Sequence, residues 1–160
     1  LEIYKLIKQK NHKVEFSSDF IIGYPGEMDN DFNDTLNLIK EIKFINSYSF
    51  IFSPRPGTPA SKLKPVSDET AKERLIEIQS VLGNHQLNKN QSLLGKSIEV
   101  LVENKLKNQN EYFGRNVFLN SVIFEGEEKY IGKLVDVKIT KTNRNTLFGK
   151  IDENKKMRAA

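Results

Sequence analysis

One segment of the sequence combines residues that suit a flat, nitrogen-rich ligand: Asp19-Phe20-Ile21-Ile22-Gly23-Tyr24-Pro25-Gly26-Glu27. Gly23 and Gly26 let the backbone approach a ligand closely, because glycine has no Cβ. The backbone after Ile21 and Ile22 can hydrogen-bond an adenine while the two side chains cover the face of its ring. The same residues also fit a plain strand-to-helix turn, with Glu27 near the N-terminus of the helix.

A second segment, Ser53-Pro54-Arg55-Pro56-Gly57-Thr58-Pro59, holds an arginine between two prolines. Proline stiffens the backbone and so aims the guanidinium, which binds carboxylate or phosphate through two parallel hydrogen bonds. Arg55 is therefore a candidate catalytic residue, with an ordinary surface arginine as the alternative. Asp19 is either a buried, hydrogen-bonded carboxylate or a site residue. His12 indicates a solvated helix end, and His85 a packed side chain.

Positive charge is concentrated in the second part of the chain. Residues 93–160 carry 13 Lys and Arg against nine Asp and Glu, whereas residues 1–92 carry 12 of each. A local basic excess is typical of a surface that binds phosphate, although an ordinary solvated surface is the alternative.

Aromatic residues accompany this charge. Tyr112 and Phe113, beside Gly114-Arg115, are candidate platforms on which unpaired bases can stack. We expect Phe118 and Phe124 to lie in a core instead. The other candidate nucleic-acid contacts are the basic residues Arg115, Lys96, Lys133, Lys138 and Lys141.

The first part of the sequence alternates between helix and strand patterns. The patterns predict helices over 1–11, over 29–44 and from Ser67 onward, and strands over 14–22 and 47–52. The last helix has an apolar stripe that predicts a packing face: Ala71, Leu75, Ile78, Leu82 and His85. The segment 84–92, rich in Asn and Gln, indicates the end of this helix and a linker. A strand–helix–strand order favours a parallel sheet, in which ligand sites lie at the carboxyl ends of the strands.

After Gly95 the pattern becomes all-β. Alternation over 97–103 places Ile98, Val100 and Val102 on one face, and further strands are predicted at 110–116, 117–124, 133–141 and 146–151. Five short strands at regular spacing predict a small closed barrel of the oligonucleotide-binding kind. The fold class is thus α/β followed by all-β, with a polar tail over 153–160.

Composition excludes several classes of site. The chain has no Cys and only two His, so a disulfide scaffold, a thiolate zinc site and a Cys-ligated iron–sulfur cluster are excluded within it, and no metal site is expected. No apolar run approaches the roughly 20 residues that span a bilayer. Because the sequence lacks an initiator Met, we expect it to be part of a larger cytoplasmic protein. Nothing in it resembles a catalytic triad or a Walker loop.

Together, the two loop segments and the barrel pattern with Gly114-Arg115 and Ile131-Gly132-Lys133-Leu134-Val135-Asp136-Val137 resemble the radical S-adenosylmethionine methylthiotransferases. The resemblance covers residues 1–152 and is closest to the branch that modifies isopentenyladenosine in tRNA. It implies that residues 1–92, with the connecting helix 67–92, are the C-terminal part of a radical-SAM (β/α) partial barrel. It implies further that residues 93–152 are a TRAM domain, a small OB-like barrel that holds tRNA.

The resemblance also assigns roles to residues. Ile21, Ile22, Gly23 and Glu27 match the family's adenine-contacting strand motif, GxIxGxxxE, although Asp19 stands where that motif has its first Gly. Arg55 matches the arginine of the family's SPRPGT loop, near the active centre. The cofactors implied for the intact enzyme are S-adenosylmethionine and two [4Fe–4S] clusters, neither ligated by this Cys-free chain.

The implied reaction makes a 5′-deoxyadenosyl radical, takes hydrogen from an adenine carbon and installs a methylthio group. The implied partners are the anticodon stem-loop of tRNA and an electron donor such as flavodoxin or ferredoxin, with no membrane. Without the cluster cysteines this chain should be inactive alone. Two alternatives remain: a non-catalytic RNA-binding module, and a related methylthiotransferase acting on threonylcarbamoyladenosine or a ribosomal protein.

Overall fold

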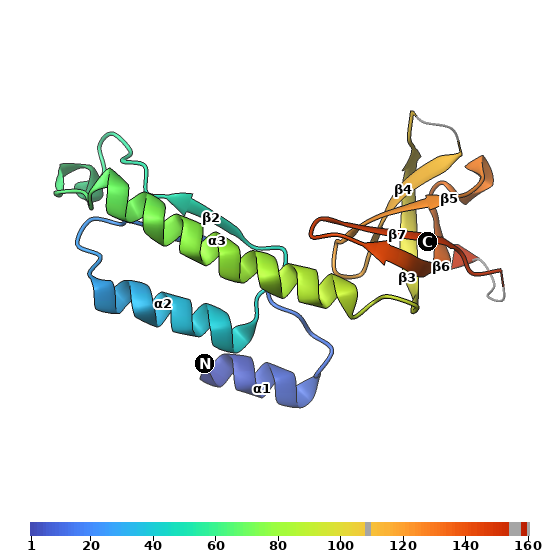
Figure 1. Ribbon diagram of the computed structural model, residues 1–160, viewed down its shortest axis with the longest axis horizontal. Helices are drawn as coiled ribbons and strands as arrows, with labels where there is room; N and C mark the ends of the chain where they lie inside the picture. The colour runs from blue at the N-terminus through green and yellow to red at the C-terminus, as the bar shows by residue number, and fades with distance from the viewer. Residues whose placement is uncertain (108–109, 154–157, 160) are drawn as a thin grey trace. The chain divides into compact units, whose positions relative to one another are not determined.

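The computed structural model describes residues 1–107, 110–153 and the backbone of 158–159 (Figure 1). The chain divides into two compact units, Leu1–His85 and Gln86–Ala160. Each unit has its own cluster of buried apolar side chains and is described separately below.

The first unit is built around a short parallel sheet. Its elements in chain order are α1 (Glu2–Lys10), β1 (Asp19–Ile22), α2 (Asp29–Ile42), β2 (Tyr48–Ile51), the 3-10 helix η1 (Pro59–Lys62) and α3 (Asp68–Gln91). β1 and β2 pair in parallel, with Ile21 opposite Phe50 and Ile22 opposite Ile51. The predicted strand–helix–strand unit is therefore present, with a first strand that begins at Asp19 instead of residue 14.

Two helices bury the sheet on one side. Phe20 and Ile22 of β1 point into the core, where they meet a row of α2 side chains: Phe32, Leu36 and Ile39. The apolar stripe predicted on α3 packs against the same cluster through Ile78 and Leu82. Because β1 alternates between exposed and buried residues, its two faces have different roles.

α3 runs from Asp68 to Gln91, close to the connecting helix 67–92 that the resemblance implies. The segment 84–92, interpreted from its Asn and Gln as helix end and linker, is helical up to Gln91 and contains no separate linker before that residue. Asn90 in this segment is fully buried and hydrogen-bonded to the barrel through its side chain. Tertiary contacts of this kind override a low helix propensity.

The second unit is a closed five-stranded barrel. Its elements are β3 (Ser97–Lys105), β4 (Glu111–Asn116), β5 (Ser121–Glu125), the 3-10 helix η2 (Glu128–Tyr130), β6 (Lys133–Thr142), β7 (Thr146–Ile151) and β8 (Arg158–Ala159). The strand order is β3-β4-β5-β7-β6, and a further pairing of β3 with β6 closes the barrel (Figure 1). The predicted small barrel is confirmed.

Two details of the barrel differ from the predictions. The second strand of the β4–β5 pair begins at Ser121 and not at 117, because residues 116–120 form a tight turn held by the Asn116 side chain. Within the predicted tail, β8 pairs with β6 at Lys133 and Leu134. Residues 154–157 and 160 of that tail lie outside the described residues.

Glycines at two strand crossings let the barrel close. A Cβ on Gly149 of β7 would lie 2.5 Å from the carbonyl oxygen of Lys138 on β6, and one on Gly114 of β4 would meet the carbonyl oxygen of Leu101 on β3. No side chain fits at either point, so the strands approach this closely only with glycine. The interior is filled by a compact apolar set: Val100, Val102, Tyr112, Val122, Phe124, Val135, Val137, Ile139 and Leu147.

Two kinds of feature are absent from the described residues. None of their helices is both long enough and apolar enough to cross a bilayer. Nor do the described residues contain a group of three or more His, Cys, Asp or Glu side chains placed to hold a metal ion.

Candidate cofactor loop and nucleic-acid surface

The loop after β1 is held by the carboxylate of Glu27. The Gly23 N–H donates to Glu27 Oε2 at 3.0 Å, and Arg74 Nη1 on α3 donates to Glu27 Oε1 at 2.6 Å. Arg74 Nη2 also donates to Asp29 Oδ1, at the start of α2, at 2.5 Å. One guanidinium thus fastens α3 to both ends of the Glu27–Asp29 segment.

Arg74 is a buried cation whose charge is matched. Its side chain is 8% exposed and lies over the ring of Phe32, with 5.3 Å from Cζ to the centroid. Burial lowers the pKa of Arg74, but hydrogen bonds to Asp29 and Glu27 outweigh that effect, so its pKa lies above the ordinary value. Arg74 was not among the residues predicted from the sequence. The available signal was its position, three residues after Ala71 and four before Ile78 on the apolar stripe.

The predicted adenine contacts separate into two groups. The Ile21 side chain is 59% exposed, beside Phe50, which is 53% exposed, so together they form an apolar surface at the end of the sheet. Ile22 is 1% exposed and packs in the core, so its side chain cannot cover a ligand. Both oxygens of Glu27 are occupied within the protein, which makes its carboxylate a support for the loop.

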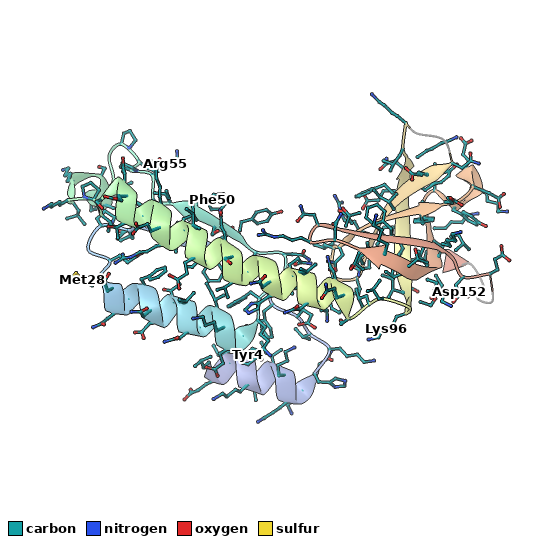
Figure 2. All side chains as sticks on the ribbon, viewed as in Figure 1. Tyr4, Met28, Phe50, Arg55, Lys96 and Asp152 are labelled. Carbon is teal, nitrogen blue, oxygen red and sulfur yellow. The ribbon has the colours of Figure 1, made fainter. Side chains whose placement is uncertain are left out.

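Arg55 lies in the loop that follows β2, where its side chain is exposed (Figure 2). Its carbonyl oxygen accepts hydrogen bonds from the Thr58 N–H at 3.2 Å and from Thr58 Oγ1 at 2.8 Å. The turn therefore fixes the backbone of Arg55 and leaves the guanidinium available. Asp19 is exposed at the other end of β1, so of the two alternatives for it the buried carboxylate is excluded.

In the barrel, one predicted stacking platform was wrong. Tyr112 is 2% exposed and its ring lies 6.5 Å from that of Phe124 in the core, so no base can stack on it in this structure. The prediction failed because β4 turns Tyr112 inward with the buried Gly114 and Asn116. Phe124 is buried, as expected, whereas Phe118 is only half-buried.

The other two candidates on β4, Phe113 and Arg115, already make contacts within the barrel. Arg115 Nη1 lies 3.0 Å from Glu103 Oε1, and the Arg115 guanidinium covers the Phe113 ring at 5.3 Å. Arg115 remains 46% exposed and its ion pair is therefore a weak one. A phosphate could displace Glu103 from it, but Phe113 offers a base only the face that Arg115 leaves open.

The lysines predicted to bind RNA lie on the outside of the barrel. Lys96, Lys138 and Lys141 are exposed and Lys133 is half-buried (Lys96 is labelled in Figure 2). Lys138 on β6 lies directly opposite Lys150 on β7. Like charges in this position repel each other, and a bound anion would relieve the repulsion.

Asparagines connect three segments at one end of the barrel. Asn90 Nδ2 donates to the carbonyl oxygens of Asn143 at 2.9 Å and Arg144 at 3.0 Å, in the β6–β7 turn. Asn120 Nδ2, from the β4–β5 turn, donates to Asn90 Oδ1 at 3.2 Å. Since Asn90 is fully buried, this network fixes both turns against the last residues of α3.

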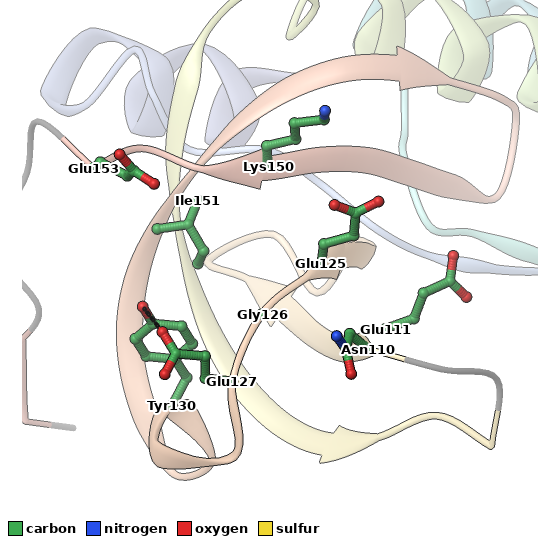
Figure 3. Close-up of a pocket in the computed structure, with 9 residues that line it drawn as sticks. All are labelled: Asn110, Glu111, Glu125, Gly126, Glu127, Tyr130, Lys150, Ile151 and Glu153. Carbon is green, nitrogen blue, oxygen red and sulfur yellow. Dashed lines mark hydrogen bonds between the residues drawn. The ribbon is translucent and has the colours of Figure 1, made fainter.

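A hollow rich in glutamate lies at the other end of the barrel. The hollow has a volume of about 840 Å³ (Figure 3). Four glutamates and one lysine line it: Glu111, Glu125, Glu127, Glu153 and Lys150. The other lining residues are Asn110, Gly126, Tyr130 and Ile151. Lys129 and Tyr130 both donate hydrogen bonds to the Glu127 carboxylate. The hydrogen bond from Lys129 is the main reason why the pKa of Glu127 lies below its ordinary value. Carboxylates in this number repel phosphate, which disfavours RNA inside the hollow.

Comparison with known proteins agrees with this architecture. Residues 91–151 match the family model described as TRAM domain. These residues are therefore similar to TRAM domains. The match begins at the last residue of α3 and ends with β7, so the matched region contains all five strands of the closed barrel.

The rest of the chain has named relatives as well. Over 160 residues, all of this chain, it is 52% identical to the tRNA-2-methylthio-N(6)-dimethylallyladenosine synthase of Pelagibacter ubique (strain HTCC1062), covering 36% of that protein. It is 41% identical over 152 residues to the protein of the same name from Wolbachia pipientis wMel, covering 93% of this chain and 35% of the relative. It is 45% identical over 159 residues to the protein of the same name from Vibrio vulnificus (strain YJ016), covering 96% of this chain and 34% of the relative.

The chain thus spans about a third of the length of the curated relatives it matches. The similarity predicted from the two loop segments and the TRAM barrel is confirmed by these matches. The matches extend through both units of the chain.

Proposed function

We propose that this chain forms the cofactor-side loops and the tRNA-binding domain of a methylthiotransferase that acts on dimethylallyladenosine (isopentenyladenosine) in tRNA. The observation that carries the proposal is the 52% identity, over the whole chain, to a relative with that activity in its name. The first unit would be the C-terminal part of a radical-SAM partial barrel and the TRAM domain would bind the anticodon stem-loop.

Some of the predicted cofactor residues in the first unit are placed to contact the adenosine moiety of S-adenosylmethionine. The exposed Ile21 side chain would cover the adenine face, and the open backbone around Gly23 would reach its edge. Glu27 would support this loop from behind, because its carboxylate binds the Gly23 N–H and Arg74. The cofactor, when bound, supplies the radical chemistry of the family.

Iron–sulfur clusters do not fit this chain. Their usual ligands are cysteine thiolates, and the sequence contains no Cys. The intact enzyme would take both clusters from outside these 160 residues and receive electrons from a donor such as flavodoxin or ferredoxin in the cytoplasm. Arg55, exposed on a fixed turn, would be the residue of this chain that contacts the reacting groups.

Binding of RNA by the whole chain tests the proposal. We expect a fluorescein-labelled tRNA anticodon stem-loop to bind, with an affinity that falls steeply as KCl rises, because each phosphate contact releases counterions. The matched control is a DNA hairpin of the same sequence. Binding that is absent, or that does not depend on salt, would contradict the proposed role of the TRAM domain.

The catalytic part requires the intact protein. There, Arg55→Lys keeps the charge but loses the paired hydrogen bonds, so we expect turnover to fall while tRNA binding is unchanged. Lys62→Gln, an exposed cation in η1, is the control. Normal turnover of Arg55→Lys and of Arg55→Ala would remove Arg55 from the site.

A further inference from the structure

Three segments meet at one end of the barrel: the end of α3 with the residues that follow it (86–95), the β4–β5 turn with the adjoining strand ends (116–121) and the β6–β7 turn with the adjoining strand ends (140–148). The Asn90 side chain joins them through hydrogen bonds to Asn120, Asn143 and Arg144. We call this surface the Asn90 end. Of the residues predicted from the sequence to bind RNA, this surface contains only Lys141.

The Asn90 end has a single sign of charge. Its three segments contain Lys89, Lys141 and Arg144 and no Asp or Glu. The acidic hollow lies at the opposite ends of the same strands, since β4 runs from Glu111 to Asn116 and β5 from Ser121 to Glu125. The Asn90 end is thus uniformly basic, whereas the opposite end mixes the glutamates of the hollow with Lys129 and Lys150. A surface with one sign of charge attracts a polyanion.

The same end presents apolar side chains to solvent. Val117 is 84% exposed and Leu119 is 72% exposed, at the tip of the β4–β5 turn. The Lys89 ammonium lies 4.8 Å from the centroid of the half-buried Phe118 ring between them, and the Lys141 ammonium lies 5.8 Å from that of Phe148. Exposed apolar groups set among cations match the chemistry of an unpaired nucleotide, which offers a base face and a phosphate.

The turn is held by internal hydrogen bonds despite its exposure. Leu119 has a φ of 61°, in the left-handed region that side chains disfavour by about 1–2 kcal/mol. Asn116 imposes this conformation, because its Oδ1 accepts the N–H groups of Phe118 and Asn120, each at 3.0 Å. A strained turn that holds two apolar side chains in water is typical of a ligand contact and not of an ordinary hairpin.

We infer that the Asn90 end is the RNA-contacting surface of the TRAM barrel, with Val117 and Leu119 against unpaired bases and Lys89, Lys141 and Arg144 on phosphates. The inference rests on the proposed function, since it locates the binding that the proposal requires. The occupant is single-stranded RNA, because a duplex has no open base faces for the two apolar side chains.

Two double variants of the whole chain test the inference by fluorescence anisotropy over a KCl series. Lys89→Gln/Arg144→Gln removes two phosphate contacts, so affinity should fall roughly tenfold and the slope of log K against log [KCl] by about 1 to 1.5. The matched control, Lys105→Gln/Lys129→Gln, makes the same charge change at the acidic end and should bind as the parent chain does. Circular dichroism checks that each variant folds.

The apolar contacts need a different readout. Val117→Ser/Leu119→Asn replaces both apolar side chains with polar ones. Asn is chosen at position 119 because it tolerates the left-handed conformation found there. We compare an anticodon stem-loop with a blunt RNA duplex of the same length. The parent should prefer the stem-loop, and this variant should lose the preference, whereas Lys89→Gln/Arg144→Gln should weaken both RNAs equally. Ile131→Ser, an exposed apolar residue outside the Asn90 end, is the control.

The outcomes separate the inference from the proposed function. If the parent chain binds RNA and both double variants bind it equally well, the Asn90 end is not the surface, while the proposed function stands. If the apolar variant keeps the stem-loop preference, Val117 and Leu119 do not contact bases, and a protein contact is indicated instead. If the parent binds no RNA, the proposed function fails and the inference with it.

Discussion

Gly23 packs directly against Ala71: a Cβ placed on Gly23 would lie 2.9 Å from the Cβ of Ala71 on α3. Gly23 also has a φ of 73°, a conformation that other residues rarely adopt. The loop that follows β1 is thus shaped by α3 as well as by its own glycines. Arg74, one turn after Ala71, fastens the same loop through Glu27.

Gly23→Ala should destabilise the first unit by about 2–3 kcal/mol, since left-handed strain adds to the collision with Ala71. Gly26→Ala should cost about 1 kcal/mol, because Gly26 has a φ of 90° but nothing within 4 Å of the added methyl. Urea unfolding followed by helical circular dichroism measures both. The double variant Gly23→Ala/Ala71→Gly should cost less than the sum of its singles; simple additivity would show that the collision is absent.

Arg74→Met should destabilise the first unit by about 3 kcal/mol, because it leaves the mostly buried Glu27 carboxylate without its cation. The methionine keeps much of the apolar stem over Phe32. Lys72→Met, an exposed position on the same helix, is the control and should change the free energy of unfolding little. Equal effects of the two substitutions would mean that the Arg74–Glu27 pair does not hold the loop.

The stability of the first unit should fall when the pH drops below 6.5. Burial lowers the pKa of His85 below its ordinary value of 6.5, and the charge of Lys43 lowers it further. Between the two pKa values the unfolded state binds more protons than the folded state, so the free energy of unfolding decreases as the pH falls. Urea midpoints at about pH 7.5 and pH 5.5 should show a larger drop for the parent than for His85→Gln; identical drops would contradict the assignment.

Asn90→Ala should destabilise the barrel by about 2–3 kcal/mol, because the carbonyls of Asn143 and Arg144 and the amide of Asn120 lose their buried partner. Asn88→Ala, exposed on the same turn of α3, should have little effect or stabilise slightly. Hydrogen exchange of the barrel amides reports the change. Unaltered exchange in Asn90→Ala would show that the network does not support the two turns.

Much of the fold is predictable from the sequence because its periodicities are clear. The alternation of Ile98, Val100 and Val102 and the spacing of Ala71, Ile78 and Leu82 each predict a buried face, and each face is buried. Local glycine and proline also placed the loops after β1 and β2 correctly. These features depend on neighbours in the sequence, which is why a single sequence reveals them.

The site was harder to predict because it depends on contacts between distant residues. Arg74 meets Glu27 across 47 positions, and Asn90 meets Arg144 across 54, so neither partnership has a local signature. Tyr112 was expected on the surface because it stands beside Gly114-Arg115, yet the alternation of β4 turns its side chain inward. Long-range pairing of this kind decides which polar residues are structural and which remain available to a ligand.

The central claim is that the TRAM barrel binds RNA through its Asn90 end. Titrating the ¹⁵N-labelled chain with an anticodon stem-loop and recording amide chemical shifts tests it most directly. The account predicts that the largest shifts fall in 86–95, 116–121 and 140–148. Shifts concentrated around the acidic hollow, at Glu111, Glu125 and Glu127, or confined to the first unit, would contradict it.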